Sequence, residues 1–81
     1  MKETFRIERS DVQESWNGHR GELRGSTIVL RHAPTGIEVK GDVAMGRYTN
    51  RQIHAAEAEL REQLMQKLTD AVARHLRIPG R

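Results

Sequence analysis

Four residues that could do chemistry lie close together in the N-terminal part of the chain: Trp16, His19, Arg20 and Glu22. They supply an aromatic ring, an imidazole, a guanidinium group and a carboxylate within one polar stretch. Rings of this kind stack on unpaired bases, and guanidinium groups bind phosphate. The stretch therefore predicts an RNA-contacting surface in which Trp16 or His19 stacks on a base and Arg20 or Arg24 meets phosphate. The alternative is that Trp16 folds back onto a small core while its neighbours stay polar and flexible, and the sequence favours neither.

Catalytic and metal-binding chemistry is not indicated. A histidine and a carboxylate three residues apart, such as His19 and Glu22, are too common to define an acid–base pair. The chain has no cysteine and no His-Glu-x-x-His spacing, and its glycines do not precede a helix as a phosphate-binding loop requires. We therefore predict no catalytic residue, no metal site and no cofactor. If the chain did catalyse a hydrolysis, His19 would be the candidate group. We expect all four histidines on the surface: His19, His32, His54 and His75.

Further cations extend the predicted phosphate-binding set. Arg31 and Lys40 belong to the outer face of a predicted hairpin, and Arg47 and Arg51 stand at the start of a predicted helix. We expect these two groups to lie beside each other. Arginine, which binds phosphate in a planar, bidentate manner, supplies most of the cations. Residues 46–81 hold seven Lys or Arg against four Asp or Glu, which accounts for the net charge of +3. An ordinary solvated surface is the alternative.

The elements that must position these residues follow from the apolar patterning. Residues 4–9 alternate, with Phe5 and Ile7 on one face, and predict a short first strand. Residues 10–25 contain three glycines and little periodicity, and they predict a long loop. The candidate RNA-contacting side chains would then lie on that loop.

A β-hairpin is predicted next, over residues 26–39. Pro34 presets the backbone for a turn and Gly36 closes it, between two runs of β-branched and aliphatic residues. The residues expected to face the core are Ile28, Leu30, Ile37 and Val39.

One long helix is predicted for the rest of the chain. Thr49 or Asn50 can cap its start, and Pro79-Gly80 ends it. Its apolar face has helical spacing: Ile53, Ala56, Leu60, Leu64, Leu68, Val72 and Leu76. At about 1.5 Å per residue it would be roughly 40 Å long, more than a small sheet covers. We therefore expect its distal residues to protrude and meet a partner: Val72, Leu76 and Ile78.

Together these elements predict one α+β domain over residues 1–78, with residues 79–81 as a flexible tail. The domain would be a small, mainly antiparallel three-stranded sheet packed by one long C-terminal helix. Eighty-one residues suffice for one thin core.

The hairpin also resembles a known family. Residues 32–39 read HAPTGIEV, which resembles the H-x-P-T-G-I-x-V hairpin in the catalytic domain of class I peptide chain release factors. Arg9-Ser10 and the run from Asn50-Arg51-Gln52 to Ala55-Ala56 look like the segments that open that family's loop and long helix. The resemblance implies the same order of elements, with the catalytic Gly-Gly-Gln tripeptide on the loop before the hairpin. Here that loop reads Asn17-Gly18-His19-Arg20, so no catalytic residue carries over.

The function expected from the sequence is a non-catalytic, release-factor-like module that binds the ribosome or structured RNA, similar to small release-factor-like proteins of bacteriophages. The alternative is a protein-interaction module, such as a phage-encoded host modulator or a homodimer, that acts through the distal part of the helix. No apolar run is long enough to cross a membrane, and no signal peptide begins at Met1. A cytoplasmic location is expected.

Overall fold

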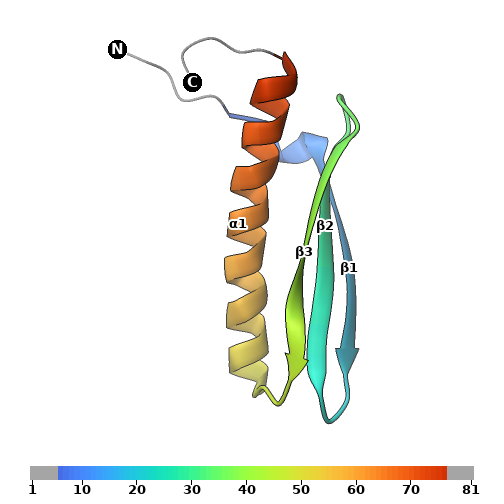
Figure 1. Cartoon of the computed structure of the whole chain (residues 1–81), viewed down its shortest axis with the longest axis vertical. Coiled ribbons are helices and arrows are strands. Elements are labelled where there is room, and N and C mark those ends of the chain that lie inside the picture. Colours follow the sequence, from blue (N-terminus) through green and yellow to red (C-terminus); the bar gives the residue numbers. More distant parts are fainter. Residues whose placement is uncertain (1–5, 77–81) are drawn as a thin grey trace, which may run out of the picture.

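The structure of the chain is a computed structural model that describes residues 6–76. After a 3₁₀ turn at Arg9–Asp11, three strands form an antiparallel meander in the order β1-β2-β3: β1 is Val12–Arg20, β2 is Arg24–His32 and β3 is Ile37–Gly46. Helix α1, Asn50–Leu76, runs along one face of this sheet (Figure 1). The predicted α+β fold, with three antiparallel strands and one long C-terminal helix, is confirmed.

The turn between β2 and β3 is built as the sequence predicts. Gly36 has φ +76°, in the left-handed region that glycine adopts without a steric penalty. The Gly36 amide donates to the His32 carbonyl at 2.7 Å, and His32 Nδ1 lies 2.8 Å from Thr35 Oγ1. His32 is buried, so the expectation that all four histidines lie on the surface is wrong for this one. The ring is held in the turn by its contact with Thr35.

The segment before this hairpin is not a loop. Residues 12–20 pair with β2 along nine consecutive positions, from Val12 opposite His32 to Arg20 opposite Arg24. The predicted loop over residues 10–25 is therefore wrong, because most of it is β1 and the start of β2. The predicted first strand over residues 4–9 is also wrong over its described part, since residues 6–8 are irregular and Arg9 begins the 3₁₀ turn. Phe5 lies outside the described residues.

The core lies between the sheet and the helix. Ile28 and Leu30 point from β2 towards Leu64, Leu68 and Val72 of α1, and all five are buried. Ile37 and Val39 of β3 pack against this cluster, as predicted from the hairpin pattern. At about 25 cal/mol per Å² of apolar surface, burial of these side chains is the main stabilising term.

Helix α1 begins with a reciprocal cap. The Gln52 amide donates to Thr49 Oγ1 at 3.1 Å, and the Thr49 amide donates to Gln52 Oε1 at 2.9 Å. This pair satisfies two backbone donors and fixes where the helix starts, so the predicted capping role of Thr49 is confirmed.

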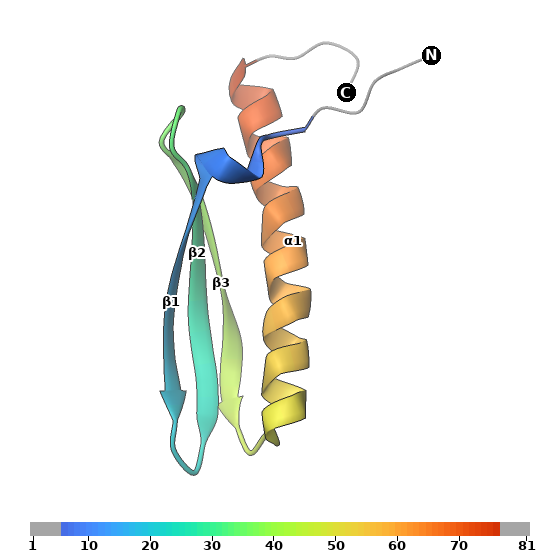
Figure 2. The same cartoon turned by 180° about the vertical axis from the view of Figure 1, so that it is seen from behind.

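The distal half of α1 does not protrude from the fold. Strands of nine or ten residues are roughly 30 Å long, and Ile7, ahead of the 3₁₀ turn, packs against the far end of the core. Figure 2 shows the chain before β1 crossing towards the distal half of the helix. Val72 is fully buried as a result. The prediction that it belongs to an exposed partner surface is wrong.

Candidate nucleic-acid interface

Four arginines from four parts of the chain meet at one end of the molecule. Arg20 ends β1, and it pairs across the sheet with Arg24, the first residue of β2. Arg24 lies opposite Gly46, which precedes Arg47, and the Arg24 guanidinium donates to Asn50 Oδ1 at the start of α1, beside Arg51. We call this cluster of Arg20, Arg24, Arg47 and Arg51 the basic end.

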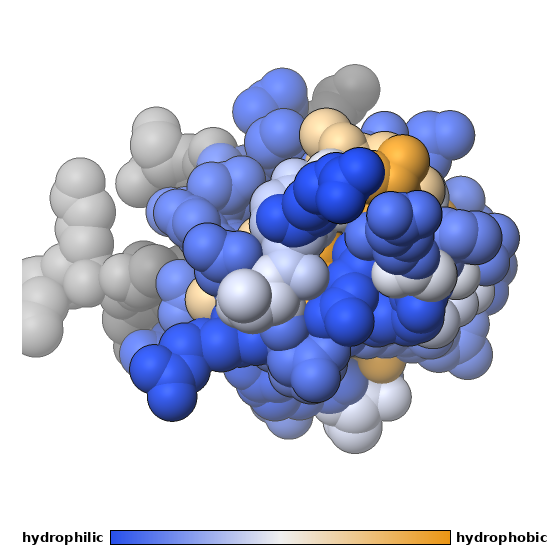
Figure 3. All heavy atoms as spheres, turned by 90° about the horizontal axis from the view of Figure 1, so that it is seen from below, coloured by the Kyte–Doolittle hydropathy of each residue, from blue (hydrophilic) through white to orange (hydrophobic). Residues whose placement is uncertain are grey.

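The surface of this end is mostly hydrophilic. Figure 3 views the molecule from below, where the β1–β2 turn and the start of α1 lie, and hydrophobic residues occupy only small areas of that view. Arg47 and Glu22 are 3.7 Å apart and both largely exposed, so their ion pair is weak. The first turn of α1 carries no acidic residue. The basic end therefore has a local excess of positive charge.

A buried carboxylate fixes one of these arginines. Glu57 Oε2 accepts hydrogen bonds from Arg20 Nη2 at 2.8 Å, Ser26 Oγ at 2.7 Å and Trp16 Nε1 at 3.1 Å. Arg20 also lies over the indole of Trp16, 4.8 Å from the ring centroid, within the range of a cation–π interaction. The Arg20 guanidinium is thus held by two groups before any ligand arrives.

The same contacts decide the charge of Glu57. Burial by itself would raise its pKa, but the hydrogen bonds from Arg20, Ser26 and Trp16 and the positive charge of Arg20 outweigh burial and lower the pKa to about 2. Glu57 therefore stays ionised at neutral pH. Arg61, one helical turn after Glu57, bonds to a different carboxylate: its Nε donates to Glu14 Oε2 of β1 at 3.0 Å.

Trp16 has a structural role that neither sequence interpretation anticipated. Its ring lies over Gly18, where a Cβ atom would come within 2.3 Å of the indole. The side chain is nevertheless 42% exposed. Trp16 is therefore held in place at the margin of the core, with part of its ring open to solvent.

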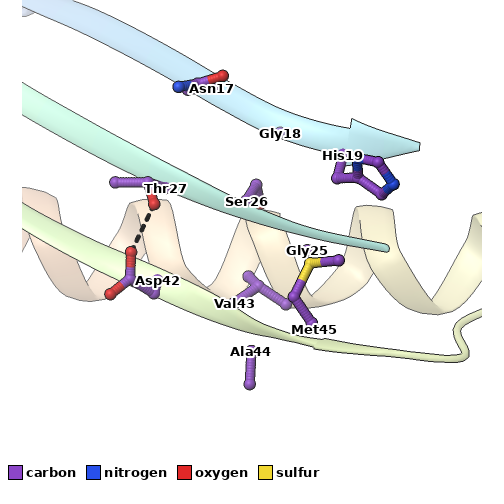
Figure 4. A pocket seen from close by; sticks show the side chains of 10 residues that line it. All are labelled: Asn17, Gly18, His19, Gly25, Ser26, Thr27, Asp42, Val43, Ala44 and Met45. Carbon is purple, nitrogen blue, oxygen red and sulfur yellow. Dashed lines mark hydrogen bonds between the residues drawn. The ribbon is translucent and has the colours of Figure 1, made fainter. Parts of the chain in front are cut away.

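His19 faces the other side of the sheet, away from the helix. It lines a shallow hollow of about 480 Å³ together with Asn17, Thr27, Asp42 and Met45. Figure 4 shows the Thr27 side chain donating to Asp42 across β2 and β3, a bond of 2.6 Å. His19 and Trp16 thus lie on opposite faces of β1, and they do not form one stacking site.

The remaining predicted contacts lie elsewhere. Arg31 is at the far end of β2, where it pairs with Glu38 at 3.8 Å. Lys40 lies opposite Val29, partway along β3. The expectation that Arg31 and Lys40 lie beside Arg47 and Arg51 is wrong, because the hairpin runs away from the helix start. Arg31 is about 23 Å along the strand from Arg24.

The structure describes two residues of the predicted protein-interaction set, and only one of them is accessible. Leu76 is 50% exposed, whereas Val72 is in the core. Ile78 and the predicted tail at residues 79–81 lie outside the described residues.

Glu57, Ser26 and Asn50 organise the basic end, and none of them is among the site residues predicted from the sequence. Glu57 did carry a signal, because it lies four positions after Ile53 and three before Leu60, on the apolar face of the helix. A charged residue at such a position must find partners when it is buried. Ser26 is an ordinary strand residue, and Asn50, the first residue of α1, is predicted only as an alternative cap, so neither carries a comparable signal.

Within residues 6–76, no group of three or more His, Asp or Glu side chains is arranged to hold a metal ion. Over that same part of the chain, no helix has both the length and the apolarity needed to cross a membrane. No family model, curated protein or solved structure matches this chain.

Proposed function

We propose that the chain is a non-catalytic, release-factor-like module that binds the ribosome or another structured RNA through its basic end. The observation that carries the proposal is the convergence of Arg20, Arg24, Arg47 and Arg51 from both ends of the β1–β2 turn and both sides of the β3–α1 connection. Such a cluster offers several planar donors to neighbouring phosphates. A role on the ribosome would place the protein in the cytoplasm.

The arginines divide into two kinds. Arg20 and Arg24 are oriented by Glu57 and Asn50, which reduces the side-chain entropy lost on binding. Arg47 and Arg51 are exposed, and the contact of Arg47 with Glu22 is long enough to give way to a phosphate. Two oriented donors together with two exposed donors in one cluster suit a nucleic-acid backbone.

The hairpin resemblance supports the release-factor-like part of the proposal, and it concerns the opposite end of the sheet. No Gly-Gly-Gln occurs in the chain, and residues 17–20 are strand. The proposed module therefore binds without hydrolysing peptidyl-tRNA.

Co-sedimentation with ribosomes and binding to a structured rRNA fragment, over a series of salt concentrations, test the proposal. The double variant Arg47→Gln/Arg51→Gln should weaken binding and reduce the slope of log affinity against log salt by about 1 to 2, because up to two phosphate contacts are lost. The control is Arg74→Gln, an exposed arginine near the other end of α1.

Two results contradict the proposal. One is a folded protein that does not bind ribosomes or RNA at low salt. The other is an equal loss of affinity in the Arg74→Gln control, because binding would then depend on overall charge and not on the basic end.

A further inference from the structure

Strand β1 leaves one backbone edge unpaired in the described structure. It is the first strand in the order β1-β2-β3, and its pairing with β2 shows no irregularity over nine residues. The other outer strand, β3, is interrupted by a bulge where Gly25 lies opposite residues 44 and 45. Bulges, prolines and short length are common ways of preventing edge pairing, and β1 has none of the three. The outer edge of β1 is therefore open to another strand.

The helix also leaves β1 uncovered. Figures 1 and 2 show α1 beside β3 and β2, with β1 on the far side of the sheet. Long polar side chains connect β1 to the helix, through Glu14 to Arg61 and through Arg20 to Glu57. Trp16 lies between these two contacts with its ring partly exposed. These partly exposed side chains on the helix-facing side of β1 could contact a strand added at its edge.

The sequence of β1 is complementary to itself when read in the opposite direction. Residues 14–20 are ESWNGHR. If two copies pair antiparallel about Asn17, Glu14 of each copy lies opposite Arg20 of the other. Both side chains are on the helix-facing side, and they are 39% and 35% exposed while bonded within their own chain. Opposite charges placed directly across a strand pair stabilise it.

The other positions fit the same register. Trp16 of each copy lies opposite Gly18 of the other, where no side chain competes for the space beside the ring. Ser15 lies opposite His19, and Asn17 lies opposite itself, on the sheet face away from the helix. No like charges meet at any of these positions.

We infer that the partner of β1 is a second copy of this chain, joined edge to edge about a two-fold axis at Asn17. The two sheets form one six-stranded antiparallel sheet with both helices on the same face. Because the two β1 strands run in opposite directions, the two basic ends point to opposite ends of the dimer. This surface is separate from the distal helix, whose Val72 is buried.

Single cysteines test the register, because the chain has none of its own. Directly opposite residues in antiparallel strands have Cα atoms about 4.5–5.5 Å apart, which a disulfide can bridge. Asn17→Cys should therefore crosslink to itself under mild oxidation. Ser15→Cys alone should not, because its symmetry mate lies four residues along the partner strand, roughly 13 Å away. Ser15→Cys mixed with His19→Cys should yield the mixed disulfide.

Sedimentation equilibrium measures the association without crosslinking. The protein should approach twice its monomer mass of 9.3 kDa as concentration rises. Asn17→Lys should raise the dissociation constant about fivefold or more, because two lysines would lie directly opposite each other. Ala44→Lys, an exposed change on β3, should leave it unaltered.

Several outcomes overturn the inference. A chain that stays monomeric at every concentration has no such interface. A dimer that tolerates Asn17→Lys, and whose Asn17→Cys variant forms no disulfide, uses another surface. Efficient self-crosslinking of Ser15→Cys alone contradicts the register about Asn17.

Discussion

Trp16 Nε1 donates a 3.1 Å hydrogen bond to Glu57 Oε2, and this contact joins residues 41 positions apart in the chain. It connects the outermost strand to the first half of the helix. Arg20 and Ser26 donate to the same oxygen, so one buried carboxylate holds two strands against α1. The basic end depends on this arrangement, because Arg20 takes its orientation from it.

The ionisation of Glu57 should make stability depend on pH in the acid range. Its pKa is about 2 in the folded chain and about 4.5 when unperturbed, so the unfolded state takes up the proton first as pH falls. The stabilisation is therefore complete above about pH 4.5 and is lost progressively towards pH 2, with an upper bound of about 3 kcal/mol.

Urea unfolding at a series of pH values measures this effect. Glu57→Gln should lower the free energy of unfolding by about 1–3 kcal/mol near neutral pH, and the difference from the natural chain should shrink towards pH 2. Glu59→Gln, on the exposed side of the same helix, should retain the natural acid dependence. A difference between Glu57→Gln and the natural chain that stays constant from pH 7 to pH 2 would show that ionisation of Glu57 does not stabilise the fold.

Gly18→Ala should displace the indole of Trp16. The new Cβ would lie 2.3 Å from the ring, so the ring must move and its bond to Glu57 is strained or lost. We expect a loss of about 1–3 kcal/mol and a shift in the emission of the single tryptophan. Gly21→Ala is the matched control, because its nearest neighbour is the exposed and movable end of His19. Unchanged emission in Gly18→Ala would contradict the placement of the ring.

Two alanine substitutions in the distal helix should differ sharply. Val72→Ala removes buried methyl groups and should cost about 1–3 kcal/mol. Leu76→Ala should change stability by less than about 0.5 kcal/mol, because half of that side chain is already exposed. Thermal unfolding of the two variants makes the comparison. Equal destabilisation would mean that the core ends at a different helical turn.

Gly36→Ala tests the turn that carries the release-factor resemblance. An L side chain at φ +76° costs about 1 kcal/mol, so the variant should be destabilised by about that amount. Ala33→Gly, an exposed change in the same turn, should cost less. If the two variants were equally stable, backbone strain at Gly36 would not limit this turn.

The hairpin and the helix could be predicted from the sequence because each buries one regular face. Ile28, Leu30 and Val39 alternate along strands, and Leu64 and Leu68 repeat at helical spacing. Pro34, Gly36 and the Thr49 cap supplied the boundaries. These signals are local, so the sequence alone contains them.

Strand β1 could not be predicted in the same way, because little of it is buried by apolar contact. Its inner face is held by Glu14, Trp16 and Arg20, which bond to helix residues far along the chain. Gly18, which argues against a strand when considered locally, is there because the indole needs its space. The side-chain partners that hold this strand against the helix lie 37 to 47 residues away.

The resemblance of the hairpin to release factors also rests on local signals. His32, Thr35 and Gly36 each have a contact or a backbone angle that the turn itself uses. These residues therefore report the geometry of a turn, and the cluster at the other end of the sheet carries the proposed binding.

The short connections of the meander have a consequence for how the chain folds. Three residues join β1 to β2, four join β2 to β3 and three join β3 to α1. Loops this short lose little entropy on closing, so the hairpin of β2 and β3 should assemble early and rapidly. The Glu57 contacts, which close much longer loops, should form after the main barrier. Substitutions at Glu57 should then mainly speed unfolding, whereas Gly36→Ala should mainly slow refolding.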